Sequence, residues 1–217
     1  MRKIKACIFD LDGVIVDTAK YHYLAWKRLA QELGFDFTEE QNEALKGVSR
    51  TKSLEILLQI GGINICDEEK EKLAEKKNNW YVEYIKNMVP SEILKGAKEF
   101  LYELRKNNIK IALGSASKNS MLILNKLELV DCFDAIIDGN KVKNAKPDPE
   151  VFLLGAKQLG IPNNECVVFE DSKAGIEAAL CGGMLAVGIG DKRVLDKANL
   201  VISSLSEMSM DKLQLLK

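Results

Sequence analysis

Two aspartates at the end of an apolar run are the residues best suited to carry chemistry. The run 5–9 has the pattern of a buried strand and leads directly into Asp10, Asp12 and Gly13. Because side chains alternate along a strand, Asp10 and Asp12 point toward the same side. Two carboxylates this close attract a divalent cation, and one can attack phosphorus while the other transfers protons. The alternative is an acidic turn in which Gly13 supplies a positive φ.

Three more segments carry groups that the same reaction needs. Ser115 follows an apolar run and, with nearby backbone amides, could hold phosphate oxygens. Lys146 lies just before a helix start in a loop stiffened by two prolines, where a fixed ammonium would neutralise phosphoryl charge. Glu170 and Asp171 end another buried run and could supply carboxylate oxygens to Mg²⁺. Because chemistry in open parallel sheets sits beyond the carboxyl ends of strands, we expect one site.

Each group also has an ordinary structural explanation. Ser117 would cap a helix that begins at Lys118, and we adopt this explanation for the Ser117 side chain. Taken alone, Lys146 would be a solvated surface lysine, and Asp171 would cap the helix expected over 173–181. Chance is a poor explanation for the whole set, because nucleophile pair, hydroxyl, lysine and acid pair occur in the order that one phosphoryl transfer needs.

Short apolar runs that alternate with helical patterns predict the elements that position these groups. Most runs are continuous in their apolar residues, which is typical of a parallel sheet buried on both faces. The helical stretches between them complete βαβ units and predict an α/β fold. The expected strands are residues 5–9, 110–113, 135–137, 166–169, 185–187 and 200–202.

One long segment after the first strand breaks this alternation. Between Tyr21 and about Tyr84 the patterns are helical, and Thr38 with Gln41 has the spacing of a capping box. The segment is too long for a loop and contains no convincing strand, so we expect an all-helical insert. The expected domain boundaries are 1–16 with 88–217 for the sheet domain and 17–87 for the insert.

The bulk composition excludes several classes of protein. The chain has 217 residues, of which 47% are hydrophobic, so a sizeable core can form. The formal net charge of −1, with acids and bases mixed, gives no indication of nucleic acid or of an anionic membrane as partner. No apolar run is long enough to span a bilayer. The 5 scattered cysteines argue against disulfides and a zinc site, and we expect a cytoplasmic monomer with reduced thiols.

Taken in order, these motifs resemble those of the haloacid dehalogenase-like superfamily over nearly the whole chain. The resemblance implies a Rossmann-like parallel sheet core flanked by helices, with a small all-helical cap domain inserted after the first strand. It implies Asp10 as the nucleophile and Asp12 as the general acid and base. Ser115 and Lys146 would bind the transferring phosphoryl group. The implied Mg²⁺ ligands are Asp10, the main-chain carbonyl of Asp12, Glu170 and Asp171.

Further stretches resemble the sugar-phosphate mutases of this superfamily, namely residues 17–18, 21–27, 45–50, 77–78 and 115–119. Gly114, where the family pattern leads us to expect alanine, is a mild departure. The resemblance implies a small sugar phosphate as substrate, with no nucleic acid or membrane as partner. The residues implied to contact it are Trp26, Gly47, Val48, Ser49, Arg50, Ser53, Lys77, Ser115, Ala116, Ser117, Lys118 and Asn119.

The resemblance gives specific roles to three residues of the insert. Thr18 would mark a hinge of the cap, whose closure would exclude water from the aspartyl-phosphate. His22 would position Asp12 and couple cap closure to proton transfer. Arg50 would bind the phosphate that is not being transferred, a task that suits a planar guanidinium.

Ordinary explanations stay open for the residues of the insert. His22 is the only histidine of the chain, and a lone histidine near a helix start is usually a plain polar contact. Trp26 lies four residues further on the same helix face and would serve core packing equally well. Arg50 would be a solvated charge, and Lys77 lies in a charge-rich helix where a solvated face is the default.

The reaction implied by the resemblance is an isomerisation. Phosphorylated Asp10 would pass its phosphoryl group to the 6-hydroxyl of β-glucose 1-phosphate and form β-glucose 1,6-bisphosphate. The bisphosphate would return its other phosphate to Asp10, and glucose 6-phosphate would leave. The expected cofactors are therefore Mg²⁺ and glucose 1,6-bisphosphate as activating intermediate. The alternatives are a Mg²⁺-dependent sugar-phosphate phosphatase of the same fold and a non-catalytic phosphosugar-binding protein.

Overall fold

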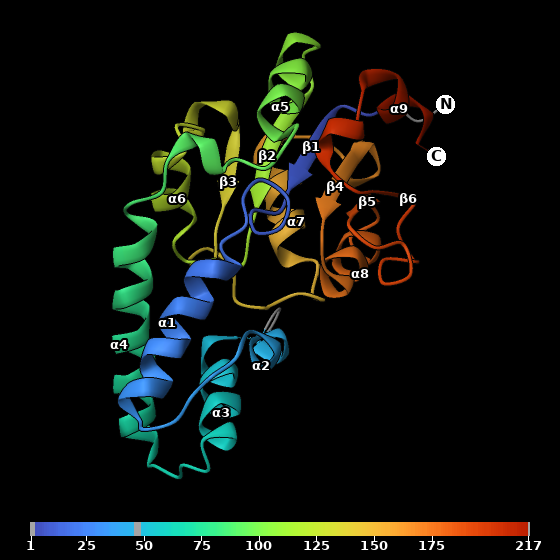
Figure 1. Cartoon of the computed structure of the whole chain (residues 1–217). Helices are drawn as coiled ribbons and strands as arrows, with labels where there is room; N and C mark the ends of the chain where they lie inside the picture. The colour runs from blue at the N-terminus through green and yellow to red at the C-terminus, as the bar shows by residue number, and fades with distance from the viewer. Residues whose placement is uncertain (1–2, 46–48, 217) are drawn as a thin grey trace. The chain divides into compact units, whose positions relative to one another are not determined.

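The protein has an α/β fold built on a parallel sheet. The computed structural model describes residues 3–45 and 49–216, and within them six strands form one sheet in the order β3-β2-β1-β4-β5-β6 (Figure 1). Every neighbouring pair of strands is parallel. The strands are β1 (Ala6–Phe9), β2 (Lys110–Gly114), β3 (Ala135–Ile137), β4 (Cys166–Glu170), β5 (Leu185–Ile189) and β6 (Leu200–Ile202).

The predicted fold class and strands are confirmed, with ends that differ by at most two residues. β1, β4 and β5 are buried at every position, as expected for strands covered on both faces. From β1 the sheet extends through β2 to β3 on one side and through β4 to β6 on the other. The strand order therefore reverses between β1 and β4, which is where open α/β sheets bind ligands.

Helices cover both faces of the sheet. α7 packs on β1, β2 and β3, and α8 packs on β4 and β5, over a layer of small apolar side chains. On the other face, α5 contributes Phe100 to an aromatic cluster in which the Phe9 and Phe169 ring centroids are 4.6 Å apart. The helices and 3₁₀ turns are η2 (Pro90–Glu92), α5 (Ala97–Lys106), α6 (Ser120–Lys126), η3 (Val130–Cys132), α7 (Glu150–Leu159), η4 (Asn163–Glu165), α8 (Lys173–Cys181), η5 (Leu205–Glu207) and α9 (Met210–Leu215).

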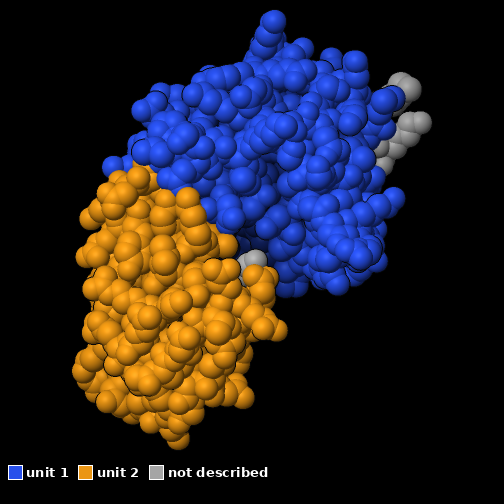
Figure 2. All heavy atoms as spheres, viewed as in Figure 1, with its two compact units in different colours: residues 1–17, 89–217 blue, residues 18–88 orange. Residues whose placement is uncertain are grey.

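The chain divides into two compact units, coloured separately in Figure 2. The sheet unit comprises Met1–Asp17 and Val89–Lys217, and the helical unit comprises Thr18–Met88. A catalytic core of residues 1–16 and 88–217 with a cap of residues 17–87 stays a prediction, as does a hinge at Thr18, the first residue of the helical unit.

The helical unit contains no strand within its described residues, 18–45 and 49–88. The predicted capping box is confirmed, because Thr38 Oγ1 accepts the Gln41 N–H and Gln41 Oε1 accepts the Thr38 N–H. None of the helices in the described parts of the chain combines the length and apolarity needed to cross a bilayer. The elements of this unit are α1 (Ala19–Glu32), α2 (Glu39–Asn42), η1 (Glu43–Leu45), α3 (Arg50–Ile60) and α4 (Asp67–Ile85).

Close packing explains the glycine at the end of β2. A β-carbon built on Gly114 would lie 2.8 Å from Cδ1 of Phe152 and 3.2 Å from Cγ2 of Ile8. Both neighbours are fully buried in the layer beneath α7, so neither has room to move aside. Alanine at this position, which the family pattern leads us to expect, would therefore overpack the core against Phe152.

We expect Gly114→Ala to lower the free energy of unfolding by about 1–3 kcal/mol, because the added methyl overpacks the core. Gly155→Ala is the matched control, since a β-carbon there would meet its nearest atom at an ordinary 3.5 Å. Alanine also forms helix better than glycine, so the control should be as stable as the wild type or more so. Urea denaturation measures both variants. Equal stability of the two would contradict the packing argument.

Candidate active site

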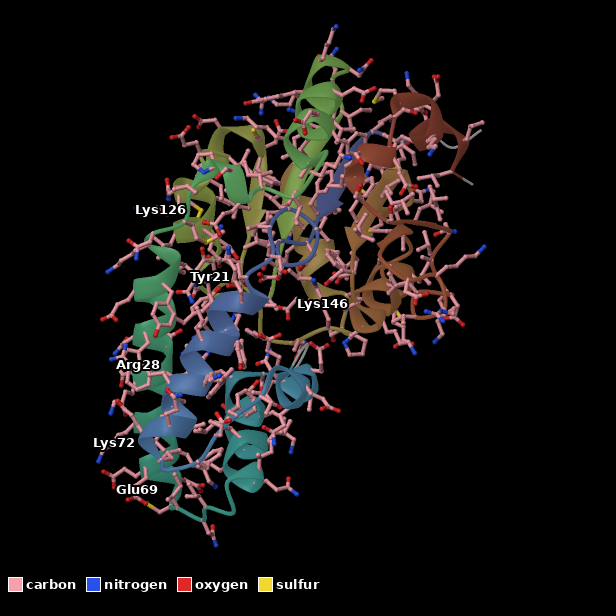
Figure 3. All side chains as sticks on the ribbon, in the orientation of Figure 1. Tyr21, Arg28, Glu69, Lys72, Lys126 and Lys146 are labelled. Carbon is pink, nitrogen blue, oxygen red and sulfur yellow. The ribbon has the colours of Figure 1, made fainter. Side chains whose placement is uncertain are left out.

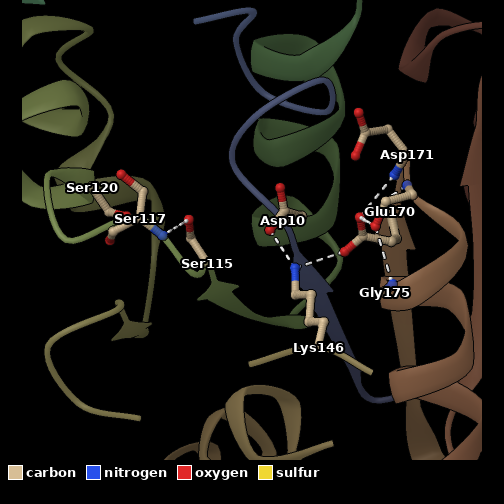
Figure 4. Close-up of polar contacts among 9 residues, drawn as sticks. Asp10, Ser115, Ser117, Ser120, Lys146, Glu170, Asp171 and Gly175 are labelled. Carbon is tan, nitrogen blue, oxygen red and sulfur yellow. Dashed lines mark hydrogen bonds and ion pairs between the residues drawn. The ribbon is translucent and has the colours of Figure 1, made fainter. Parts of the chain in front are cut away.

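Asp10, Lys146 and Glu170 form a buried charged cluster at the carboxyl edge of the sheet (Figure 4). Asp10 follows β1 and Glu170 ends the neighbouring β4. Lys146 Nζ lies 2.5 Å from Asp10 Oδ1 and 2.7 Å from Glu170 Oε2. The Lys146 side chain is only 11% exposed, so a solvated surface lysine is the wrong explanation for it. The structure thus brings together three groups that the sequence places 24 to 160 positions apart.

The loop after β4 holds the Glu170 carboxylate. Its Oε1 accepts the Asp171 N–H at 3.2 Å, the Ser172 N–H at 3.0 Å and the Ser172 hydroxyl at 2.7 Å. Ser172 Oγ in turn accepts the Gly175 N–H, so Ser172 is the N-cap of α8. The alternative in which Asp171 caps this helix is therefore wrong. The Asp171 side chain is left for another task.

Two glycines let the backbone approach the carboxylates closely. Gly13 has the predicted positive φ, +75°, and a β-carbon on it would lie 2.0 Å from Asp171 Oδ2. A β-carbon on Gly175 would lie 2.0 Å from Cδ of Glu170. The loop after β1 and the first turn of α8 therefore fit around the acid pair only because both residues lack a side chain.

The loop after β1 also brings Asp12 close to the cluster. The loop is closed by backbone hydrogen bonds from Gly13 to Val16 and from Val16 to Leu11. Asp12 is partly exposed, and its charge acts on Asp10 by raising the pKa of that carboxyl. The two aspartates predicted to work as a pair thus lie close enough to interact. Their roles as nucleophile and general acid stay predictions.

Negative charge exceeds positive charge in the cluster. Burial raises the pKa of Asp10 to about 7, with Lys146 acting to lower it and Glu170 to raise it further. Burial, followed by Glu170 and Asp10, raises the pKa of Asp171 to about 8. Burial also acts to raise the pKa of Glu170, but Lys146 and the hydrogen bonds described above hold it below its usual value. One ammonium therefore stabilises Glu170 and cannot balance all three acids.

The carboxylates have the chemistry and spacing to hold a divalent cation. Oxygens of Asp10, Glu170 and Asp171 all lie within 4.8 Å of one another. Hard cations such as Mg²⁺ prefer oxygen ligands. A cation here would also relieve the repulsion that raises the pKa of Asp10 and Asp171. The residues present therefore fit the metal that the sequence predicts, while the main-chain carbonyl of Asp12 as a further ligand stays a prediction.

Ser115 lies beyond β2 at the start of a segment rich in local hydrogen bonds. It is 1% exposed, and its Oγ accepts the Ser117 N–H at 3.1 Å. Ser117 Oγ accepts the Asn119 N–H at 3.2 Å. α6 begins at Ser120 with Asn119 as its N-cap, so the predicted helix start at Lys118, capped by Ser117, is wrong. The reason is that these hydroxyls close tight turns ahead of the helix.

Within the helical unit, Lys77 and His22 form a polar pair among aromatic rings. Lys77 Nζ lies 2.8 Å from His22 Nδ1, 4.3 Å from the ring centroid of Trp26 and 5.1 Å from that of Tyr81. When Lys77 is protonated it only donates, so Nδ1 then accepts and the His22 ring proton lies on Nε2. Burial, followed by the charge of Arg50, lowers the pKa of Lys77. Burial, then Lys77 and Arg50, lowers that of His22.

The solvated face expected for Lys77 is wrong, because the residue is only 2% exposed. Glu69 and Lys72 of the same helix do lie on the outside of the helical unit (Figure 3). The charge-rich pattern of α4 therefore predicts exposure correctly for most of the helix and fails at Lys77, which faces Trp26. Trp26 is itself 3% exposed, so it packs in the core of its unit and contacts Lys77 as well.

The remaining predicted contact residues lie in varied settings. Ser49 is the N-cap of α3, Arg50 is its exposed first residue, and Ser53 is buried one turn later. Ala116 and Lys118 of the sheet unit are exposed. Their contacts with substrate stay predictions. The predicted contact residues outside the described part of the chain are Gly47 and Val48.

Sequence patterns did not single out Tyr81, Ser172 or Gly175. Tyr81 stacks on His22 with ring centroids 4.1 Å apart. Its position four residues after Lys77 is a usable signal, because such residues share a helix face. Ser172 is a standard N-cap residue immediately ahead of a helix. Gly175 carried no signal, since its role depends on the approach of Glu170 in three dimensions.

The chain belongs to the haloacid dehalogenase-like hydrolase family, whose model matches residues 4–183. It is 42% identical to β-phosphoglucomutase of Bacillus subtilis (strain 168) over 96% of this chain and 93% of that protein. The crystal structure of β-phosphoglucomutase from Clostridium difficile superimposes with a TM-score of 0.89 at 46% identity, over 97% of this chain and 96% of that one. A phosphorylated carbohydrates phosphatase of Thermotoga maritima is 36% identical over 83% of this chain and 82% of its own length. The predicted superfamily is confirmed.

We expect Gly175→Ala to weaken Mg²⁺ binding by about tenfold or more, because the new methyl would displace the Glu170 carboxylate. Gly155→Ala again serves as control, since this helical glycine has room for a β-carbon. Its Mg²⁺ affinity should stay within about twofold of the wild type, well below the losses typical of disturbed metal ligands. Isothermal titration with Mg²⁺ measures both. Equal affinity in the two variants would contradict Glu170 as a ligand.

Proposed function

We propose that this chain is a β-phosphoglucomutase, an isomerase that interconverts β-glucose 1-phosphate and glucose 6-phosphate. The observation that carries the proposal is 42% identity to the Bacillus subtilis enzyme of that name over 96% of the chain. The buried cluster of Asp10, Lys146 and Glu170 supports it, because it provides a carboxylate nucleophile beside a fixed positive charge.

Asp10 is the nucleophile of this proposed mechanism. Its carboxylate attacks phosphorus and forms an aspartyl-phosphate, while the bond from phosphorus to the sugar oxygen breaks. Asp12 protonates that leaving oxygen. In the opposite step, Asp12 removes the proton of the attacking sugar hydroxyl, which takes the phosphoryl group from Asp10. The same pair of carboxylates therefore serves both directions.

The isomerisation uses this step twice. The phosphoryl group of Asp10 passes to the 6-hydroxyl of β-glucose 1-phosphate and gives β-glucose 1,6-bisphosphate. The bisphosphate then turns over and returns the phosphate on carbon 1 to Asp10. Glucose 6-phosphate leaves, and the enzyme is again phosphorylated. Glucose 1,6-bisphosphate therefore acts as the activating intermediate.

Charge neutralisation is the main contribution of the groups around Asp10. Lys146 stabilises the Asp10 carboxylate at 2.5 Å and neutralises phosphoryl charge when a phosphate is bound. Ser115 and the amides that follow it bind phosphoryl oxygens. Asp10, Glu170 and Asp171 would hold Mg²⁺, which would supply further neutralisation of phosphoryl charge when bound.

We assign the recognition of the sugar and its second phosphate to the helical unit. Arg50 is exposed and permanently charged, and a guanidinium binds phosphate oxygens in pairs. His22 presents Nε2–H as a donor, because Lys77 occupies its other ring nitrogen. Trp26 packs against Lys77 inside this unit and so supports the pair that Lys77 forms with His22. Exclusion of water distinguishes a mutase from a phosphatase, since water would hydrolyse the aspartyl-phosphate.

We expect Asp10→Asn to abolish both phosphoryl transfers, with a loss of more than about a thousandfold, because an amide cannot attack phosphorus. Asp131→Asn is the control, since Asp131 is an exposed aspartate of the same unit at the start of a 3₁₀ turn. Its turnover should equal that of the wild type. Conversion of β-glucose 1-phosphate to glucose 6-phosphate measures both variants. Turnover of Asp10→Asn within about tenfold of wild type would sink its assignment as nucleophile.

The mutase and phosphatase functions are separated by measuring two products in one tube. The enzyme receives Mg²⁺, β-glucose 1-phosphate and a trace of glucose 1,6-bisphosphate. A mutase starts from phosphorylated Asp10, so the bisphosphate should remove a lag, and glucose 6-phosphate should far exceed inorganic phosphate. Release of one phosphate per substrate without glucose 6-phosphate would instead establish the phosphatase function.

We expect Arg50→Ala to lower the apparent affinity for β-glucose 1-phosphate strongly. A desolvated contact between a guanidinium and a phosphate is worth about 2–5 kcal/mol when one partner is removed. Arg28→Ala is the control in the same unit, because Arg28 packs over the Trp80 ring at 4.2 Å. It should lose stability without a comparable loss of substrate affinity. Equal effects of the two variants on KM would contradict the assignment of Arg50.

A further inference from the structure

The turn that follows β3 holds the carbonyl groups of the segment Ser115–Asn119. Gly139 N–H donates to the Ser117 carbonyl at 3.0 Å, and Asn140 Nδ2 donates to the Lys118 carbonyl at 3.0 Å. The last residue of β3 also contacts the start of this segment, because the Ser115 N–H donates to Ile137 O at 2.9 Å. Successive residues after β3 therefore brace successive residues after β2.

The fit between the two segments leaves no space for a side chain at Gly139. A β-carbon there would lie 2.2 Å from the Ala116 carbonyl oxygen and 3.1 Å from the Lys118 nitrogen. These neighbours are backbone atoms, which cannot swing aside as a side chain would. The turn therefore lies directly against the backbone of the Ser115–Asn119 segment.

Asp138 fixes the orientation of the Asn140 side chain. Asp138 is 5% exposed, and its Oδ1 accepts the Asn140 N–H at 3.0 Å. Its Oδ2 accepts from Asn140 Nδ2 at 3.1 Å. One hydrogen of the Asn140 amide thus goes to Asp138 and the other to the Lys118 carbonyl. Although Asn140 is exposed, its amide has one defined direction.

Anchoring these carbonyls also sets the direction of the amides that follow them. A peptide unit is planar and trans, so its N–H points opposite to its C=O. With the Ser117 carbonyl held toward Gly139, the Lys118 N–H must point away from the turn. With the Lys118 carbonyl held toward Asn140, the Asn119 N–H points back to Ser117 Oγ, which accepts it at 3.2 Å.

We propose that Asn140, together with Gly139, is a positioning residue that holds the peptide units on both sides of Lys118 and so directs the Lys118 N–H at phosphate oxygens. The expected effect of Asn140 on isomerisation rests on the proposed function, whereas its expected effect on phosphate binding does not. Asn140 itself contacts no phosphate. It acts through the Lys118 carbonyl, and a purely structural asparagine would change stability alone.

Two variants of Asn140 and one control test the proposal. Asn140→Ala removes the donor, and Asn140→Leu keeps a branched side chain of similar size without charge but cannot donate to the Lys118 carbonyl. Asn107→Ala is the matched control, because Asn107 Nδ2 donates to the Glu103 carbonyl at 2.8 Å ahead of β2, at the other end of the sheet. All three lose one contact from a side-chain amide to a backbone carbonyl, and the Asn140 variants also lose the donation to Asp138 Oδ2.

Affinity for inorganic phosphate is the first measurement, taken from the rise in melting temperature that phosphate causes at saturating Mg²⁺. We expect both Asn140 variants to bind phosphate about fivefold to tenfold more weakly than Asn107→Ala, the range of one lost hydrogen bond. Mg²⁺ affinity should be unchanged, since the carboxylates come from β1 and β4. In turnover, kcat/KM should fall by a similar factor.

Two results would overturn the proposal. Phosphate affinity of the Asn140 variants equal to that of Asn107→Ala shows that the contact only stabilises the fold. A parallel loss of Mg²⁺ and phosphate affinity shows a general collapse of the site. Failure of the proposed function looks different: the wild type would form no glucose 6-phosphate, while the Asn140 variants would still bind inorganic phosphate more weakly than the control.

Discussion

Lys146 donates to Asp10 and Glu170 and so joins three segments that are far apart in the chain. Buried carboxylates are costly without a positive partner, and removing that partner typically destabilises a protein by about 3–5 kcal/mol. One ammonium does not suffice here, because Asp171 keeps a pKa raised to about 8. The cluster thus accommodates more positive charge than the chain supplies. Both a divalent cation and a nucleophilic carboxylate fit this arrangement, because the acids of the cluster outnumber its positive charges.

Close approach of backbone to functional groups is the second constraint on the site. Gly13 and Gly175 lie where a methyl would collide with the acid pair, and Gly139 lies where it would collide with a carbonyl oxygen. In each case the absence of a side chain lets one segment lie directly against another. The backbone is consequently packed tightly around the site. Small substitutions at these glycines act on chemistry, whereas Gly114→Ala acts on the core beneath it.

The sequence predicted the features that depend on local pattern. Strands buried on both faces are continuous apolar runs, and a strand end rich in acids marks a site at the carboxyl edge of a sheet. The sequence predicted burial poorly where tertiary contacts override the local pattern of polar and apolar residues. Lys77 belongs by pattern to a charged helix face, yet it is buried against His22 and Trp26. Both predicted helix caps were off by one or two residues, because Asn119 rather than Ser117 precedes α6 and Ser172 rather than Asp171 accepts the Gly175 N–H of α8.

Burial divides the positive charges of the helical unit into two kinds. Lys77 is enclosed by aromatic rings, and burial lowers its pKa, so it is poorly suited to hold a full charge against a solvated anion. Its hydrogen bond instead orients the His22 ring. Arg50 is exposed, and its guanidinium stays charged under all ordinary conditions. Of these two cations, Arg50 is therefore better suited to the phosphate contact that we propose, and Lys77 to orienting the His22 ring.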